Sequence, residues 1–237
     1  MKTRSTVLQV EKPRREAKSR SVDPLLKTRA YDELRSRILN NDLPAGSFLA
    51  ERTLARELGM SKTPVKAALE RLQQEGFVAI SPQQGIVVRD LSVQEIADQY
   101  ELCEALESFI LRTLAGRLND AQIERLRANL RAQNAIRGSD DVPQWVALNT
   151  EFHMQFPEFL GNEEIRRILG QLRDRMQRIL TRVFHLDPAR IDSSYQEHVA
   201  IAEAVISGDG LRAAHLAAAH LQTGRQLILV PRGQRMA

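Results

Sequence analysis

Residues 43–88 read LPAGSFLAERTLARELGMSKTPVKAALERLQQEGFVAISPQQGIVV, and the spacing of apolar residues and glycines in this stretch predicts a winged helix-turn-helix. Apolar residues recur at helical spacing over 54–58, and Gly59 then supplies the positive φ angle that often ends a helix. Ser61 is placed to cap a second helix, which Gly76 closes. We expect this second helix to be the recognition helix that enters the major groove of DNA.

A β-hairpin is predicted directly after the recognition helix. Two short runs rich in β-branched and apolar residues, 77–80 and 86–88, flank a turn that contains Ser, Pro, Gln and Gly. This hairpin is the expected wing. A further helix over 25–39, with apolar residues in steps of four, is expected to pack across the helix pair and to offer Arg35 to a phosphate.

Polar and basic side chains gather at the start of the expected recognition helix, where donors reach phosphates and base edges. In the alternative interpretation, Lys62 and Lys66 are only the solvated face of an ordinary helix. The predicted DNA contacts are Arg35, Arg52, Ser61, Lys62, Thr63, Lys66, Gln84 and Gly85.

The segment 44–76 resembles the GntR family of bacterial transcription regulators, whose signature contains Pro-Gly, Leu-x-Glu, Leu-Ala, Leu-Gly, Ser-Arg-Thr-Pro-Val-Arg-x-Ala-Leu and Leu-x-x-x-Gly. Lys62 and Lys66 stand where the family usually has arginine, and lysine lacks the planar fork that reads guanine bidentately. The resemblance implies a regulator that binds a palindromic double-stranded operator. Because one recognition helix reads only a half-site, we expect a homodimer.

Composition is that of an ordinary globular protein of one or two domains, with 237 residues, 43% of them hydrophobic and 27% charged. The single cysteine, Cys103, excludes an intramolecular disulfide and fits a reducing cytoplasm. No apolar run approaches the length of a membrane span, and the N-terminus lacks the apolar core of a signal peptide. A cytoplasmic protein without a membrane partner is therefore expected.

The distribution of charge and the positions of helix-capping and helix-breaking residues divide the chain into four parts. Residues 1–23 hold seven Lys or Arg and three acidic residues, and this tail either contacts DNA phosphates or is a solvated leader. The DNA-binding domain is expected over 24–90. Ser92 and Glu95 form a capping-box pattern that opens the next helix, and residues 231–237 form a second tail. An all-α domain is expected over 91–230, with helices at 93–117, 121–138, 143–160, 163–184, 189–207 and 210–229.

The candidate metal ligands of this second domain are mainly histidines. Asn149 and His153 are four residues apart and so share one helix face, while His198 and His220 lie on the last two predicted helices. Imidazole nitrogens and an oxygen donor suit divalent Zn, Ni, Mn or Fe. Spacing alone leaves open that these are core histidines with ordinary hydrogen-bond partners.

Residues 93–229 resemble the FCD type of GntR effector domain, a bundle of six or seven helices. The matching pieces are Phe152-His153 followed by Gly161-Asn162, Glu197-His198 followed by Gly208-Asp209, and His220-Leu221. The resemblance implies metal ligands at His153, His198 and His220. Asn149 stands where the family usually has an aspartate ligand.

The resemblance also implies a small-molecule effector, often a carboxylate, whose binding changes operator affinity, most commonly by relieving repression. Cys103 lies four residues before Glu107, where the family commonly has arginine. It either faces the effector or is a small buried hydrophobe.

Two other functions remain open from sequence. A metal-dependent hydrolase-like enzyme would use the histidines, with Glu197 beside His198 as the available carboxylate. A constitutive DNA-binding protein without an effector would use only the winged helix-turn-helix, and its DNA affinity would not respond to metabolites.

Overall fold

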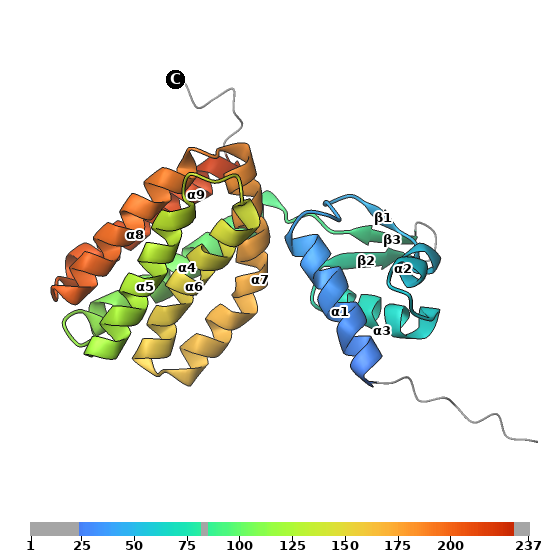
Figure 1. Cartoon of the computed structure of the whole chain (residues 1–237), viewed down its shortest axis with the longest axis horizontal. Helices are drawn as coiled ribbons and strands as arrows, with labels where there is room; N and C mark the ends of the chain where they lie inside the picture. Colours follow the sequence, from blue (N-terminus) through green and yellow to red (C-terminus); the bar gives the residue numbers. More distant parts are fainter. Residues whose placement is uncertain (1–23, 82–84, 230–237) are drawn as a thin grey trace, which may run out of the picture.

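The computed structural model describes residues 24–81 and 85–229. Within them, a small α/β unit at the N-terminus is followed by a bundle made only of helices (Figure 1). The predicted tails 1–23 and 231–237 and the predicted DNA contact Gln84 lie outside the described residues. None of the helices in this described part is long and apolar enough to cross a membrane.

The N-terminal unit is the predicted winged helix-turn-helix. Its hairpin of β2 (Val78–Ser81) and β3 (Gly85–Val88) is antiparallel, with pairs running from Val78 opposite Val88 to Ser81 opposite Gly85. The sheet order is β1-β3-β2. The elements are α1 (Pro24–Leu39), β1 (Phe48–Leu49), α2 (Glu51–Glu57), α3 (Lys62–Gln74), β2 (Val78–Ser81) and β3 (Gly85–Val88).

Two local details of this unit differ from the sequence predictions. Strand β1 was not predicted, because a two-residue strand carries no periodic signal; it forms by pairing Phe48 with Val87 on β3. Ser61 occupies the N-cap position of α3 with extended backbone angles, but its side chain makes no capping hydrogen bond. The predicted glycine turn is confirmed, since Gly59 has a φ angle of +62° after α2.

Apolar residues from all three helices and the sheet form the core of the N-terminal unit. Leu34 of α1 and Leu69 and Leu72 of α3 are fully shielded from solvent. Their burial fixes one face of α3 against α1, so the opposite face is left for solvent or a partner.

The C-terminal part is an all-helical bundle with its own core. The Ser92–Glu95 capping box that opens α4 is present, with both of its hydrogen bonds formed. Helix ends differ from the predicted ones by a few residues. The bundle helices are α4 (Val93–Leu114), α5 (Asp120–Ile136), α6 (Val142–Leu160), α7 (Glu163–Leu186), α8 (Arg190–Ile206) and α9 (Gly210–Leu229).

Helix α7 lies on the side of the bundle that faces the N-terminal unit (Figure 1). The Asp174 carboxylate accepts two hydrogen bonds from the Arg35 guanidinium of α1, one of them 2.6 Å long. The Thr181 hydroxyl donates to the carbonyl oxygen of Leu39 at 3.2 Å. Helix α7 therefore belongs to the bundle and also anchors α1.

Candidate metal centre and DNA interface

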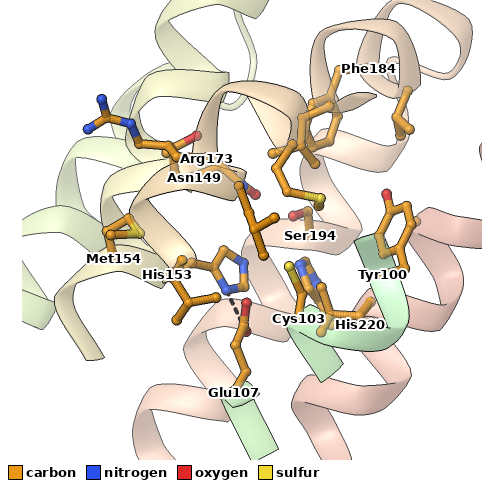
Figure 2. A pocket seen from close by; sticks show the side chains of 18 of the residues that line it. Tyr100, Cys103, Glu107, Asn149, His153, Met154, Arg173, Phe184, Ser194 and His220 are labelled. Atoms are coloured by element: carbon orange, nitrogen blue, oxygen red, sulfur yellow. Dashed lines mark hydrogen bonds and ion pairs between the residues drawn. The ribbon is translucent and has the colours of Figure 1, made fainter. Parts of the chain in front are cut away.

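Three histidines from three different helices meet inside the bundle. His153 comes from α6, His198 from α8 and His220 from α9, and the nitrogen that each offers lies within 4.8 Å of the other two. His198 is fully buried and His220 is 7% exposed. These are the three histidines that the sequence singled out as possible metal ligands; Figure 2 shows His153 and His220 from the side of the cavity.

The Nδ1 atom of His198 is held by a chain of amides on α5. It lies 2.8 Å from Gln133 Oε1, and Gln133 Nε2 in turn donates to Asn129 Oδ1 at 2.6 Å. Because this chain leaves only an oxygen to face Nδ1, the imidazole carries its proton there. The lone pair of His198 is then on Nε2.

The other two histidines are held by carboxylates. His153 Nδ1 lies 2.9 Å from Glu107 Oε2, the contact drawn as a dashed line in Figure 2, and His220 Nδ1 lies 2.5 Å from Glu197 Oε2. Arg190 also approaches His220, but it pairs with Glu197 through an Nη1–Oε1 bond of 2.8 Å. All three rings therefore place Nδ1–H on an outer acceptor, the arrangement that orients Nε2 for a metal.

Among the described residues, two candidate ligand atoms are buried without a hydrogen-bond partner, as are the hydroxyls of Tyr100 and Ser194 at the neighbouring cavity. Within the described residues, His198 Nε2 and Asn149 Oδ1 have no hydrogen-bond partner, although Asn149 is only 1% exposed. Buried polar atoms are normally satisfied, so an unmet lone pair on each of these side chains is a sign of a missing ligand. A divalent ion bound by three imidazoles and one amide oxygen fits this donor set.

Burial keeps His198 and His220 in the form that binds metal. Desolvation lowers the pKa of His198 well below its usual value, and the neighbouring His220 and His153 lower it further. Desolvation also lowers the pKa of His220, against the opposing effect of Glu197. Both rings are therefore neutral near pH 7, as a metal ligand must be.

A cavity of about 60 Å³ opens beside the histidines. Asn149, His153 and His220 line it together with Cys103 and Tyr100 of α4. Cys103 is 4% exposed, and burial raises the pKa of its thiol. Cys103 is therefore a small buried side chain that also forms part of the cavity wall. Its contact with an effector stays a prediction.

The predicted DNA contacts at the start of α3 are available to a partner. Ser61, Lys62, Thr63 and Lys66 are all exposed, and Lys66 makes only a long ion pair of 3.9 Å with Glu70. Arg52 on α2 and Gly85 at the wing are exposed as well.

Arg35 is the exception among the predicted DNA contacts. In this structure, its guanidinium is engaged by Asp174 of the bundle rather than free for a phosphate. The sequence position of Arg35 on an N-terminal helix gave no sign of a partner 139 residues away. Its observed role is to join the two parts of the chain.

Comparison with known proteins agrees with both halves of the fold. The family model described as "Bacterial regulatory proteins, gntR family" matches residues 26–88, and the FCD domain model matches residues 98–223. The chain belongs to the GntR family. A Streptomyces ambofaciens HTH-type transcriptional regulator is 30% identical to this GntR regulator over 76% of the chain and 75% of the relative.

More distant relatives show the same organisation. The Escherichia coli HTH-type transcriptional repressor RspR is 23% identical over 81% of the chain and 84% of its own length. A solved GntR regulator from Rhodococcus has a TM-score of 0.75 at 18% identity, covering 87% of this chain and 99% of that one. This family consists of transcriptional regulators, so the enzyme alternative is discarded.

The outer partners of the metal centre were only partly visible from sequence. Glu107 and Glu197 were noted for other reasons, whereas Gln133 and Arg190 were missed. One usable signal is the spacing of Asn129 and Gln133, which are four apart and share a face of α5. Two polar residues on the buried face of an amphipathic helix need a partner inside the bundle.

Proposed function

We propose that this GntR regulator is a repressor whose affinity for a palindromic operator is controlled by a small carboxylate effector, bound in the bundle at a divalent metal ion. The observation that carries the proposal is the arrangement of His153, His198 and His220, whose Nδ1 atoms are all occupied by outer partners beside a cavity. That cavity is walled by α7, which also contacts α1.

The metal would be held by Asn149, His153, His198 and His220. Zn²⁺, Ni²⁺, Mn²⁺ and Fe²⁺ all accept this set of nitrogen and oxygen donors. When bound, a divalent ion supplies a Lewis-acidic position that a carboxylate can occupy. The chain's own residues orient the imidazoles and exclude water from them. The ring of Trp145 lies parallel to that of His198, with 6.4 Å between the ring centroids, and the Phe152 ring stacks on the His198 ring with 4.3 Å between centroids.

Helix α7 offers a physical route from the cavity to the DNA-binding unit. Leu172 and Met176 line the cavity, whereas Asp174 and Thr181 on the same helix bond to α1. A ligand that prefers one position of α7 would therefore also bias the position of α1. Only this difference in affinity between two arrangements can change operator binding.

The proposal is tested with metal and DNA together. A selection from random duplexes with the full-length protein is expected to enrich a palindrome. The affinity for that palindrome is then measured by fluorescence anisotropy after EDTA treatment, after Zn²⁺ loading, and with Zn²⁺ plus short carboxylic acids. Equal affinity under all conditions would contradict effector control and favour a constitutive DNA-binding protein.

Disruption of the α1–α7 contact is expected to uncouple the two halves. In Asp174→Ala, the Arg35 guanidinium loses its partner, so movement of α7 no longer reaches α1 through this pair. The ratio of operator affinities with and without the effective ligand is expected to be about fivefold or more in the wild type. We expect it to fall towards one in the variant, measured by anisotropy.

The matched control for this change is Glu124→Ala. Glu124 also pairs with an arginine, Arg131, but both side chains are more than 60% exposed on α5. The control is expected to keep the wild-type ratio. An Asp174→Ala protein that keeps the full ratio would exclude this ion pair from the coupling.

A second copy of the chain is the partner that we propose for the exposed apolar face of α4. Leu102 and Phe109 are 41% and 48% exposed and lie seven residues apart, on one face of the helix. Phe109→Asp places a charge in this face and is expected to convert a dimer into a monomer of 26.8 kDa in light scattering. Its affinity for a palindrome should fall as well.

The control for the dimer prediction is Leu211→Asp. Leu211 is a still more exposed leucine, at 77%, at the start of α9. This variant should leave the molecular mass in solution unchanged. A wild-type protein that is itself monomeric at working concentrations would contradict the dimer.

A further inference from the structure

A second and larger cavity lies where the two parts of the chain meet. Its volume is about 420 Å³, against about 60 Å³ for the cavity beside the histidines. Its walls come from the end of α1 and the turn after it, from the linker at 90–91, and from α4, α7 and α9. The four proposed metal ligands are not among the described residues that line it. Small ligands often bind in cavities between domains.

Most of the described side chains in this wall are apolar. They come from both parts of the chain and from the linker, and burial of apolar surface is a main source of affinity for a hydrocarbon or aromatic group. The wall therefore suits a ligand with an apolar body. Examples from each segment are Leu39, Pro44, Leu91, Ile96, Ile179 and Ile228.

Arg178 on α7 places a half-buried cation in the same wall. Its Nη2 atom donates a hydrogen bond to the carbonyl oxygen of Arg89, and its Cζ atom lies 5.7 Å from the ring centroid of Phe77. Desolvation lowers the pKa of this guanidinium from its ordinary value, so the surroundings compensate its charge incompletely. A guanidinium has five N–H donors, so one bond to a backbone oxygen leaves most of them for a ligand.

The carboxylates near Arg178 are engaged by other arginines. Asp90 and Glu95 favour its charge through space, but Glu95 pairs with Arg89 at 3.2 Å. Asp90 lies 3.6 Å from Arg182, and both of these side chains are more than half exposed, so this pair is weak. The arginines and the carboxylate that line the cavity are Arg178, Arg182 and Asp90, which together carry one positive charge in excess.

The other polar residues of the wall add no second negative charge. The Thr181 hydroxyl bonds to the carbonyl oxygen of Leu39 at 3.2 Å, and His185 Nδ1 lies 2.7 Å from the carbonyl oxygen of Thr181. Asn41 has a left-handed φ angle of +67° just after α1 and contributes an exposed amide. Among the described lining residues, Asp90 is thus the one carboxylate.

We propose that this cavity is a second ligand site, for an organic monoanion with an apolar body, whose headgroup pairs with Arg178. The site requires neither the metal ion nor the histidine cavity, so it goes beyond the function proposed above. Its walls belong to the DNA-binding unit, the linker and the bundle. A ligand that fills it therefore favours one arrangement of these parts, and operator affinity changes with its binding.

The test uses anilinonaphthalene sulfonate, a monoanion whose fluorescence rises in apolar surroundings. It is titrated into full-length protein treated with EDTA, and it is then displaced by competitors. Octanoate is the monoanionic competitor, octanol is its uncharged counterpart, and suberate is a dianion of the same length. We expect octanoate to displace the probe at concentrations about 10-fold or more below those of the other two.

Two variants at the cavity are expected to weaken binding of the sulfonate and of octanoate. Arg178→Met removes the guanidinium, and the expected loss is about 10-fold or more. Because Arg178 also bonds to the linker, the second variant leaves it in place: Ala45→Phe fills the cavity from an exposed turn. It should weaken binding to a similar extent.

The matched control for the arginine change is Arg167→Met. Arg167 is an exposed arginine on the same helix that pairs with Glu164 at 2.7 Å, and it does not line the cavity. This variant should bind both anions as the wild type does.

Operator affinity is measured by anisotropy with and without octanoate on the same metal-free proteins. A change of about fivefold or more is expected in the wild type and also in His198→Ala, because the site does not use the histidines. Arg178→Met and Ala45→Phe should show little change. An operator affinity that ignores bound octanoate would overturn the regulatory role of the site.

The remaining outcomes separate this site from the others on the molecule. Unchanged binding in both Arg178→Met and Ala45→Phe would overturn the site, and equal displacement by octanol would overturn the role of the charge. Loss of binding in His198→Ala or in Phe109→Asp would place the probe in the histidine cavity or on the exposed face of α4 instead. A protein that binds the sulfonate but no metal would contradict only the metal site.

Discussion

Replacement of His198 by alanine is expected to reduce bound metal from one ion per protomer to none. The change removes one of the three converging imidazoles and leaves Gln133 Oε1 without the donor that it now faces at 2.8 Å. Metal content is measured by mass spectrometry on protein purified without chelator or a histidine tag. Metal-dependent changes in operator affinity should disappear together with the ion.

Two further variants show whether the loss is specific. His215→Ala removes an exposed histidine on α9, five residues before His220, and should keep the full metal content. Gln133→Ala leaves all proposed ligands in place but frees His198 to rotate, and it should weaken metal binding by about 10- to 100-fold. Full metal content in folded His198→Ala would show that the ion, if present, lies elsewhere.

Removal of Lys62 and Lys66 together is expected to weaken operator binding by about 100-fold or more at physiological salt, since each lost phosphate contact also loses its counterion release. Both lysines are exposed at the start of α3, whose opposite face is fixed against α1 by buried Leu69. In a dimer, the double alanine variant removes four cations. The slope of log affinity against log salt should therefore fall by about 4.

The control for this prediction is Lys27→Ala, which removes one lysine per protomer from an exposed position on α1 of the same unit. It should change the salt slope little. An unchanged slope in the double variant would support the alternative that these lysines only form a solvated face. A loss of discrimination between operator and random DNA at constant slope would instead indicate base contacts.

Local structure could be predicted from the sequence wherever the deciding interactions lie within a few residues. The Ser92–Glu95 capping box and the turn at Gly59 both belong to this class. The wing followed from its two β-branched runs. Strand β1 did not, because it exists only by pairing with β3, about 40 residues later in the chain.

The same limit applies to side chains. The position of Arg35 on an amphipathic N-terminal helix is compatible with a phosphate contact, and only the docking of α7 gives it Asp174 as a partner. The predicted cap at Ser61 has the expected backbone but lacks the side-chain bond. A sequence pattern sets which conformations are favourable, whereas packing decides which hydrogen bond is made.

The metal centre shows both contributions in one place. By itself, the sequence determined which residues could act as ligands. Helical spacing places Asn149 and His153 on one face of a helix, and the resemblance to the FCD motif picks out His198 and His220. The tertiary structure alone decided which nitrogen of each ring is free. That choice depends on Glu107, Gln133 and Glu197, which lie on other helices or other turns, 46, 65 and 23 residues from the imidazoles that they hold. A hydrogen bond over such a separation forms only when the core has packed, so no local pattern encodes it.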